Sequence, residues 1–230
     1  MPTPPIPELV VFDLGRVLLR IADDWDHCAA LSGVPLPAAL GGDISASHTR
    51  DHDDADHALE AAFAAYETGR TSTDEFFAFA APRLGLPVAD ARRLFDGWLI
   101  DPMPGLLTLL DDLDAAKAAN PKLRTACLSN TNAAHWEHID GTTGHACSMP
   151  IDRLDFPLAS QLLGHAKPDP ACYAAFERHT GFSGDAVLFL DDLPANVAAA
   201  QAHGWRAVTV PRSNDAIPFV REQLQAFGVL

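Results

Sequence analysis

The sequence predicts an α/β fold in which helices cover both faces of a parallel sheet and a helical segment is inserted near its start. Four short apolar runs, rich in Val, Leu and Phe, are too short for buried helices and are typical of buried strands. Helical patterns separate the last three runs, as in a parallel sheet. Roughly a hundred residues without a comparable strand signal separate the first two runs, far more than one crossover helix requires.

The four apolar runs are the expected strands of the sheet. The first run ends within the segment VVFDLGRVL (residues 10–18), so Asp13 is expected at the exposed end of a buried strand. Polar residues also follow the second and third runs directly. The runs are Leu9 to Phe12, Arg124 to Leu128, Ala186 to Leu190 and Arg206 to Val210.

The insertion after the first strand is expected to be a small helical domain. Ser72 and Glu75 form the pattern of a capping box and predict a helix that contains Phe76, Phe77 and Phe79. Further helices are predicted over Asp53 to Thr68 and Val88 to Leu99, with hinges near residues 18–22 and 99–104. The expected division is a core domain of residues 1–19 and 100–230 and an inserted domain of residues 20–99.

Helices of the core are marked by proline at the start and glycine just past the end. Pro170 to His179 and Pro194 to His203 are each followed by a glycine. Pro104 opens a segment whose leucines repeat at helical spacing. These helices are expected to cover the faces of the sheet.

The charge balance argues against two classes of partner. The 230 residues include 16 Lys and Arg against 31 Asp and Glu, a formal charge of −15, which repels nucleic acid and anionic membrane surfaces. No apolar run approaches the ~18 residues of a membrane-spanning helix, and the start MPTPPIPE lacks the pattern of a signal peptide. The cysteines are scattered and are expected to be buried free thiols. We therefore expect a cytoplasmic monomer or homodimer that binds a small molecule at a locally positive site.

Polar residues leave the carboxyl ends of the expected strands, where open parallel sheets bind their ligands. They are Asp13, Ser129-Asn130-Thr131 and Asp191-Asp192, with Lys167-Pro168 at a helix start before the third run. Each of them alone is better explained as a helix cap, a turn or a solvated loop. Together they supply a nucleophile, hydroxyl and amide donors, a cation and a carboxylate pair for a metal.

The segments FDLGRVLL, LSNTN, KPDP and FLDDLPANV resemble the four ordered motifs of the haloacid dehalogenase superfamily, and the insertion resembles that family's cap domain. The likeness covers nearly the whole chain after the proline-rich start. Within the family, the chain is most similar to the sugar-phosphate phosphatases that include α-glucose-1-phosphate phosphatase, which share the D-L-G form of the first motif. The resemblance implies a Rossmann-like three-layer core with a helical cap. It also implies a Mg²⁺-dependent phosphatase for a small phosphorylated metabolite, such as a sugar phosphate.

The resemblance assigns chemical roles to four residues, and the position of Arg16 directly after Gly15 suggests a role for a fifth. Asp13 attacks phosphorus and forms an aspartyl-phosphate, a task for which an ionised carboxylate needs no activating base. The Ser129 hydroxyl and the Asn130 backbone N–H donate to the phosphoryl group. Lys167 neutralises charge on Asp13 and the phosphate. Arg16 is expected either to contact the substrate or to form a salt bridge with the cap.

The resemblance also implies a Mg²⁺ site made of oxygen ligands. Its ligands are the Asp13 carboxylate, the backbone carbonyl of Gly15, and Asp192, with Asp191 bound directly or through water. Asn196 is expected to steady this loop, although an ordinary surface polar residue is an equal alternative.

Gly15 occupies the position at which most phosphatases of the family carry a second aspartate, which protonates the leaving oxygen. General acid–base catalysis contributes about 10²–10⁴-fold in rate, so the chain is expected to be slower, but not inactive. We hypothesise that the loss matters least for a leaving group of low basicity, such as the anomeric oxygen of a sugar 1-phosphate. A second hypothesis is that the cap supplies the proton, for example from His48, His52 or His57, although the aspartates among these residues favour a solvated acidic turn.

Two other functions stay open. A 2-haloacid dehalogenase would use Asp13 to attack carbon, and its halide would leave without an acid. Its chemistry needs no metal, so the Asp191-Asp192 pair argues against it. A catalytically weak or inactive phosphate-binding protein is the other alternative.

Overall fold

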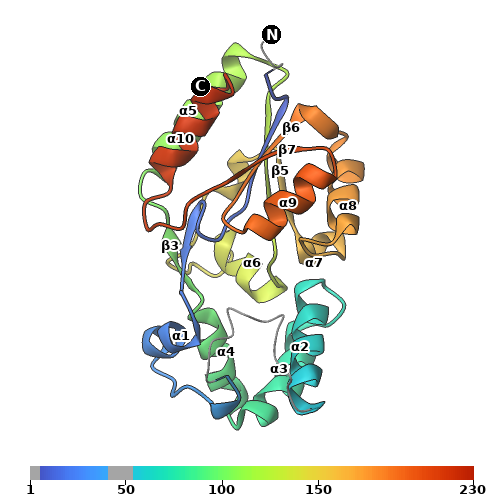
Figure 1. The fold of residues 1–230 in the computed structure, drawn as a ribbon. Coiled ribbons are helices and arrows are strands. Elements are labelled where there is room, and N and C mark those ends of the chain that lie inside the picture. The colour runs from blue at the N-terminus through green and yellow to red at the C-terminus, as the bar shows by residue number, and fades with distance from the viewer. Residues whose placement is uncertain (1–5, 41–53) are drawn as a thin grey trace.

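A computed structural model describes residues 6–40 and 54–230. Its centre is a parallel sheet of five strands in the order β5-β4-β1-β6-β7 with helices on both faces, which confirms the predicted α/β fold (Figure 1). In that order, the strands are Phe156–Ala159, Arg124–Ser129, Leu9–Phe12, Val187–Asp191 and Arg206–Thr209.

The central strand β1 is fully buried, and its side chains alternate between two apolar clusters. Val10 and Phe12 pack in the cluster that contains α5 and α10, whereas Leu9 and Val11 pack in the cluster that contains α8 and α9. A strand covered on both faces has no polar side, which explains the continuous apolar runs in the sequence. The four helices span Leu106–Ala119 (α5), Ile217–Ala226 (α10), Pro170–Thr180 (α8) and Pro194–Ala202 (α9).

The register of the sheet aligns the ends of its three central strands. Phe12 of β1 pairs with Cys127 of β4 on one side and with Leu190 of β6 on the other. The residues that follow these three positions therefore emerge at the same edge of the sheet.

Three strands lay outside the sequence prediction. β5 contains Pro157 and lies at an edge of the sheet, where a missing N–H is tolerated. Strands β2 (Leu19–Ile21) and β3 (Leu99–Pro102) form a separate antiparallel pair. The helix predicted as far as Leu99 is wrong in its last residues, because α4 ends at Asp96 and the chain then enters β3.

The inserted segment forms helices with their own apolar cluster, whose buried members lie between residues 22 and 95. The predicted capping box is confirmed: the Ser72 hydroxyl accepts from the Glu75 N–H (3.3 Å), and the Glu75 carboxylate accepts from the Ser72 N–H (3.0 Å). We propose the same two domains as before: a core of residues 1–19 and 100–230, and an inserted domain of residues 20–99. The helices are Trp25–Ser32 (α1), Asp54–Glu67 (α2), Thr73–Leu84 (α3) and Val88–Asp96 (α4), with a 3₁₀ turn at Ala38–Leu40.

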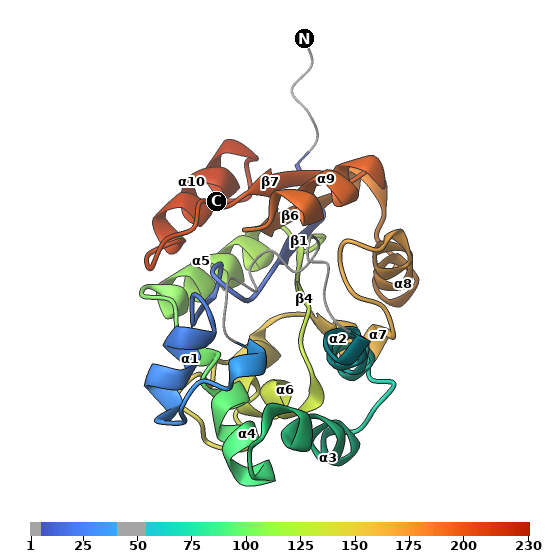
Figure 2. The same ribbon diagram turned by 60° about the horizontal axis from the view of Figure 1, so that its bottom comes forward.

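These helices lie at the end of the sheet to which the carboxyl ends of the strands point (Figure 1). Figure 2 shows α2 in front of α7, which follows β5, and α4 beside α6, which follows β4. Among the described residues, no helix is long and apolar enough to cross a membrane, and the four cysteines are buried and free, as predicted. The remaining elements are Ala133–Ile139 (α6), Ser160–Leu163 (α7), and 3₁₀ turns at Ile151–Arg153 and Gly184–Ala186.

Helix α6 contacts the inserted segment through a buried histidine. His135 is 9% exposed, and its Nε2 lies 3.0 Å from the carbonyl oxygen of Phe95 in α4. Because a carbonyl only accepts, Nε2 carries the proton in this contact. Burial lowers the pKa of His135 to about 4, although Asp96 and the Phe95 carbonyl act in the opposite direction.

This histidine is expected to make stability fall in mild acid. The ordinary pKa is 6.5, so between pH 6.5 and about 4 the unfolded chain binds a proton that the folded protein does not. The contribution is present above pH 6.5 and is lost as the pH falls, by roughly 2 kcal/mol of unfolding free energy between pH 7 and pH 5. The His135→Gln variant keeps an N–H donor for Phe95 and does not titrate, so urea unfolding should show a smaller loss. An equal loss in both proteins would contradict this prediction.

Candidate active site

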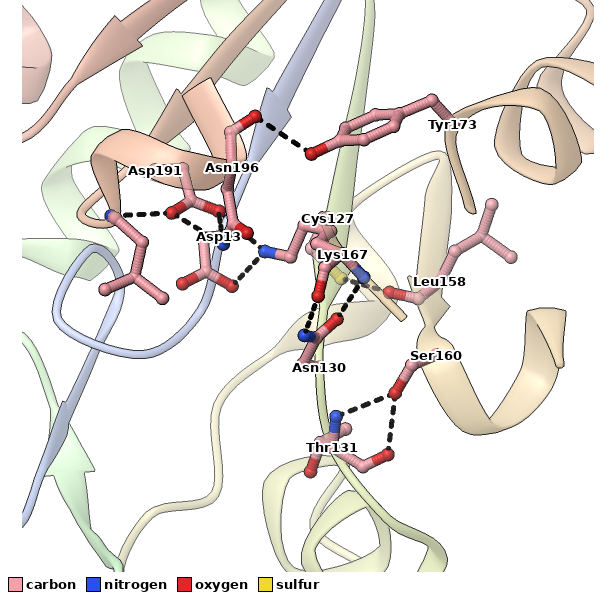
Figure 3. Close-up of polar contacts among 11 residues, drawn as sticks. Asp13, Cys127, Asn130, Thr131, Leu158, Ser160, Lys167, Tyr173, Asp191 and Asn196 are labelled. Atoms are coloured by element: carbon pink, nitrogen blue, oxygen red, sulfur yellow. Dashed lines mark hydrogen bonds and ion pairs between the residues drawn. The ribbon is translucent and has the colours of Figure 1, made fainter. Parts of the chain in front are cut away.

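Acidic side chains from two strand ends meet one buried lysine at the carboxyl edge of the sheet. Lys167 Nζ donates to Asp13 Oδ1 (2.8 Å) and to Asp191 Oδ2 (2.7 Å), as Figure 3 shows. The Lys167 side chain is 1% exposed, and Asp191 is fully buried. Burial opposes the charge on Lys167, but the two carboxylates outweigh it and raise the pKa of the ammonium, which therefore stays charged.

Asp13 directly follows β1, and its N–H extends the sheet by donating to the Leu190 carbonyl (2.8 Å). Burial raises the pKa of Asp13 to about 7, with Lys167 lowering it and Asp191 raising it. Additional positive charge near this carboxylate would favour its ionised form, which is the form that can act as a nucleophile.

Asp13, Asp191 and Asp192 together can hold a metal ion. One carboxylate oxygen of each lies within 4.8 Å of the others. All three donors are carboxylate oxygens, which suit a hard divalent cation such as Mg²⁺. Burial and Asp191 raise the pKa of Asp192, against the effect of Arg212. Crowded carboxylates of this kind are relieved by a bound cation.

The oxygens of Asp191 are already engaged by the protein. Oδ1 accepts from the Leu193 N–H (2.8 Å), and the Asn196 amide donates to both oxygens (3.1 and 3.0 Å) in addition to the bond from Lys167. Asn196 is 3% exposed, so its role is to hold Asp191 and it is not an ordinary surface polar residue. Asp192 accepts only from Arg212 (3.1 Å) among the described residues, which leaves it freer to bind a metal.

Asn130 holds Lys167 in place through its side chain. Its Oδ1 accepts from the Lys167 N–H (2.9 Å), and its Nδ2 donates to the Lys167 carbonyl (2.7 Å; Figure 3). The sequence suggested only a backbone role for Asn130. Ser129, the last residue of β4, is 6% exposed and lies at the same edge of the sheet as Asp13.

Gly15 and Arg16 form the turn after Asp13. Arg16 Nη2 donates to the Ala22 carbonyl (2.9 Å) and lies 3.7 Å from a carboxylate oxygen of Asp23. Of the two predicted roles of Arg16, these contacts favour the salt bridge with the inserted segment. A Cβ atom on Gly15 would lie 3.1 Å from Cδ1 of Ile21.

A hydroxyl connects this edge of the core to the inserted helices. Ser160 Oγ accepts from the Thr131 N–H (3.0 Å) and donates to the carbonyl of Glu67 (2.6 Å), the last residue of α2. Of the histidines considered as proton donors, His57 is exposed, whereas His48 and His52 lie outside the described residues.

A family model of haloacid dehalogenase-like hydrolases matches residues 7–204. A phosphatase of Mycobacterium tuberculosis is 37% identical over 84 residues, which are 36% of this chain and only 39% of that protein.

Two solved structures share the fold. An enzyme of the same superfamily from Bacteroides thetaiotaomicron, in complex with magnesium and inorganic phosphate, matches with a TM-score of 0.69 and 21% identity, over 91% of this chain and 96% of its own. The L-2-haloacid dehalogenase of Xanthobacter autotrophicus matches with a TM-score of 0.55 and 18% identity, over 96% of this chain and 83% of its own.

Proposed function

Because the chain belongs to the haloacid dehalogenase-like hydrolase family, as its four motifs predict, we propose that it is a Mg²⁺-dependent phosphatase of small phosphorylated metabolites. The observation that carries the proposal is the buried cluster of three carboxylates, two of which accept hydrogen bonds from Lys167. Lys167 and Arg212, which contacts Asp192, supply two positive charges against three carboxylates, and a divalent cation would balance the remaining negative charge. The partial likeness to a mycobacterial phosphatase and the magnesium and phosphate bound to the Bacteroides enzyme support the same proposal.

The proposed metal site consists of the Asp13 carboxylate, the Gly15 carbonyl and Asp192. Asp191 is expected to act through water or by holding Lys167, since its oxygens already accept hydrogen bonds. When bound, Mg²⁺ would act as a Lewis acid on the phosphoryl oxygens.

The protein's own residues account for the remaining steps. A carboxylate oxygen of Asp13 attacks phosphorus, and the bond from phosphorus to the leaving oxygen breaks. The Ser129 hydroxyl and the Asn130 N–H donate to the phosphoryl oxygens, and Lys167 neutralises charge that develops beside Asp13. The oxygen of a water molecule then attacks phosphorus, the bond from phosphorus to the Asp13 oxygen breaks, and inorganic phosphate leaves with the Asp13 carboxylate restored, while the proton of the water passes to solvent.

Gly15 offers no side chain to protonate the leaving oxygen. The proton for the leaving oxygen therefore has to come from water or from another group near the substrate. A weakly basic leaving oxygen depends least on that proton. We propose a sugar phosphate with an anomeric leaving group as the preferred substrate class. Turnover of a primary sugar phosphate that equals turnover of its anomeric isomer would contradict this preference.

The metal requirement gives the direct test. Removal of divalent cations with EDTA is expected to reduce hydrolysis of α-glucose 1-phosphate to background, and excess Mg²⁺ is expected to restore it. Phosphate release measured across a panel of phosphate esters provides the readout.

A dehalogenase would behave differently, because carbon attack by Asp13 with loss of halide needs no metal. If halide were still released from 2-chloropropionate in the presence of EDTA, the protein would be a dehalogenase and the proposed phosphatase function would be wrong. Phosphate binding with Mg²⁺ but without turnover of any ester would identify an inactive phosphate-binding protein.

A further inference from the structure

A polar cavity of about 290 Å³ lies beside the carboxylate cluster, and the proposed mechanism does not use it. Its walls come from the turn after Asp13, from strand β2 and from the loop after β7. In Figure 1, this loop runs down past β2 and β3 before it enters α10. Three arginines line the cavity, namely Arg16, Arg20 and Arg212, and we call it the arginine cavity.

The arginine cavity shares residues with the surroundings of the proposed metal site. Arg212 Nε donates to Asp192 Oδ2 (3.1 Å), so one wall of the cavity contacts a proposed metal ligand. Arg16 directly follows Gly15, whose carbonyl is another proposed ligand. The arginine cavity therefore borders the proposed metal site through Arg212.

Each of the three guanidinium groups has N–H donors that make no hydrogen bond to the described residues. Within the described part of the chain, Arg16 uses Nη2 and Arg212 uses Nε in hydrogen bonds. Arg20 uses Nε and Nη2, both on the Asp101 carboxylate. A guanidinium carries five N–H groups, and the Nη1 group of each of these arginines makes no hydrogen bond to the described residues.

The N–H donors of the lining suit the oxygens of an anion. Each arginine already contacts one carboxylate: Arg16 contacts Asp23, Arg20 contacts Asp101 and Arg212 contacts Asp192, and Asp24 also lines the cavity. An anion would therefore be held by the remaining N–H groups of the arginines and not by a net positive charge of the lining. The planar fork of a guanidinium matches the oxygens of a carboxylate or a phosphate.

We propose that the arginine cavity binds a second anionic group, a carboxylate or phosphate, carried by the phosphorylated substrate itself. This inference rests on the proposed phosphatase function and makes it more specific. At about 30 Å³ per water molecule, the cavity has room for a group of this size and part of its carbon skeleton. The preferred substrates are then sugar phosphates with a second negative charge a few bonds from the leaving oxygen.

The test compares two esters that differ at one carbon. α-Glucuronic acid 1-phosphate carries a carboxylate where α-glucose 1-phosphate carries a CH₂OH group. The wild-type protein is expected to prefer the glucuronate in kcat/KM by about tenfold or more, the usual effect of a charge-assisted hydrogen bond. Arg20→Gln is expected to abolish most of this preference, and Asn214→Asp, which adds a negative charge to the lining, to reduce it.

Arg93→Gln is the matched control, because Arg93 is exposed on α4 and pairs only with Asp90 among the described residues. It removes the same charge and should leave the preference unchanged. Equal kcat/KM for the two esters in the wild-type protein, or an equal loss of preference in the control, would overturn the proposal.

Calorimetry with the Mg²⁺-loaded Asp13→Asn variant separates this inference from the proposed function. Tighter binding of the glucuronate ester that depends on Arg20 would support the cavity even if no ester is turned over. Malonate, a separate dicarboxylate, tests whether the anion in the arginine cavity belongs to the substrate or is an independent ligand. Competition between malonate and the glucuronate ester supports the substrate's own group, whereas malonate that binds beside that ester identifies a separate anion and overturns the proposal.

Discussion

Replacing Asp13 by Asn is expected to lower kcat for phosphate esters by ~10⁴-fold or more, the scale seen when a nucleophile is removed. An amide of the same shape cannot form the acyl-phosphate. Its oxygen can still accept the hydrogen bond that Lys167 Nζ now donates to Asp13. The measurement is phosphate release in a single assay with saturating Mg²⁺ and α-glucose 1-phosphate.

The Asp13→Asn variant is expected to be at least as stable as the wild-type protein. Burial raises the pKa of Asp13 to about 7, so ionised Asp13 is unfavourable in the metal-free protein near neutral pH. A neutral amide avoids that cost, and the thermal midpoint should stay unchanged or rise. Asp185→Asn provides the control, because Asp185 is an exposed carboxylate in a short turn remote from the sheet's carboxyl edge. Retained turnover in Asp13→Asn with lost turnover in Asp185→Asn would exclude Asp13 as the nucleophile.

The parallel sheet and the edge that carries the site could be predicted because both depend on local patterns. Each apolar run is buried on two faces, and parallel strands align their carboxyl ends, so Asp13 and Asp191 had to emerge together. Strand β5 could not be predicted in the same way, since a four-residue segment with proline carries no distinct signal. It becomes a strand only because β4 presents an unpaired edge to it.

The residues that hold the site residues in place could not be predicted from local sequence patterns. Asn130 clamps the backbone of Lys167 from 37 residues away, and a spacing of that length is set by the fold and not by any local pattern. Arg212 lies in an irregular loop after β7, and its contact with Asp192 depends on how that loop passes the sheet edge. Asn196 had two interpretations of equal weight until its burial and its bonds to Asp191 favoured one.

Restoring an acid at position 15 is expected to raise the turnover of esters that have strongly basic leaving oxygens. Gly15→Asp supplies a carboxyl group two residues after Asp13, at the position where the family's general acid is expected. The gain in kcat/KM for an alkyl ester such as glycerol 3-phosphate is expected to be about 10²–10⁴-fold. For α-glucose 1-phosphate, whose leaving oxygen is less basic, the gain should be less than about tenfold.

The structure can accept this side chain with a small adjustment. The added Cβ would lie 3.1 Å from Cδ1 of Ile21, the flexible end of a side chain, and Gly15 does not require a left-handed backbone conformation. The double variant Gly15→Asp with Ile21→Val removes that methyl group and tests whether crowding limits the gain. Asn at position 15 has the same shape as Asp but no acidic proton to transfer, so Gly15→Asn should give no gain. If Gly15→Asn matched Gly15→Asp, or if both esters gained equally, the missing proton donor would not be what limits the rate, and the proposed preference for anomeric phosphates would lose its physical basis.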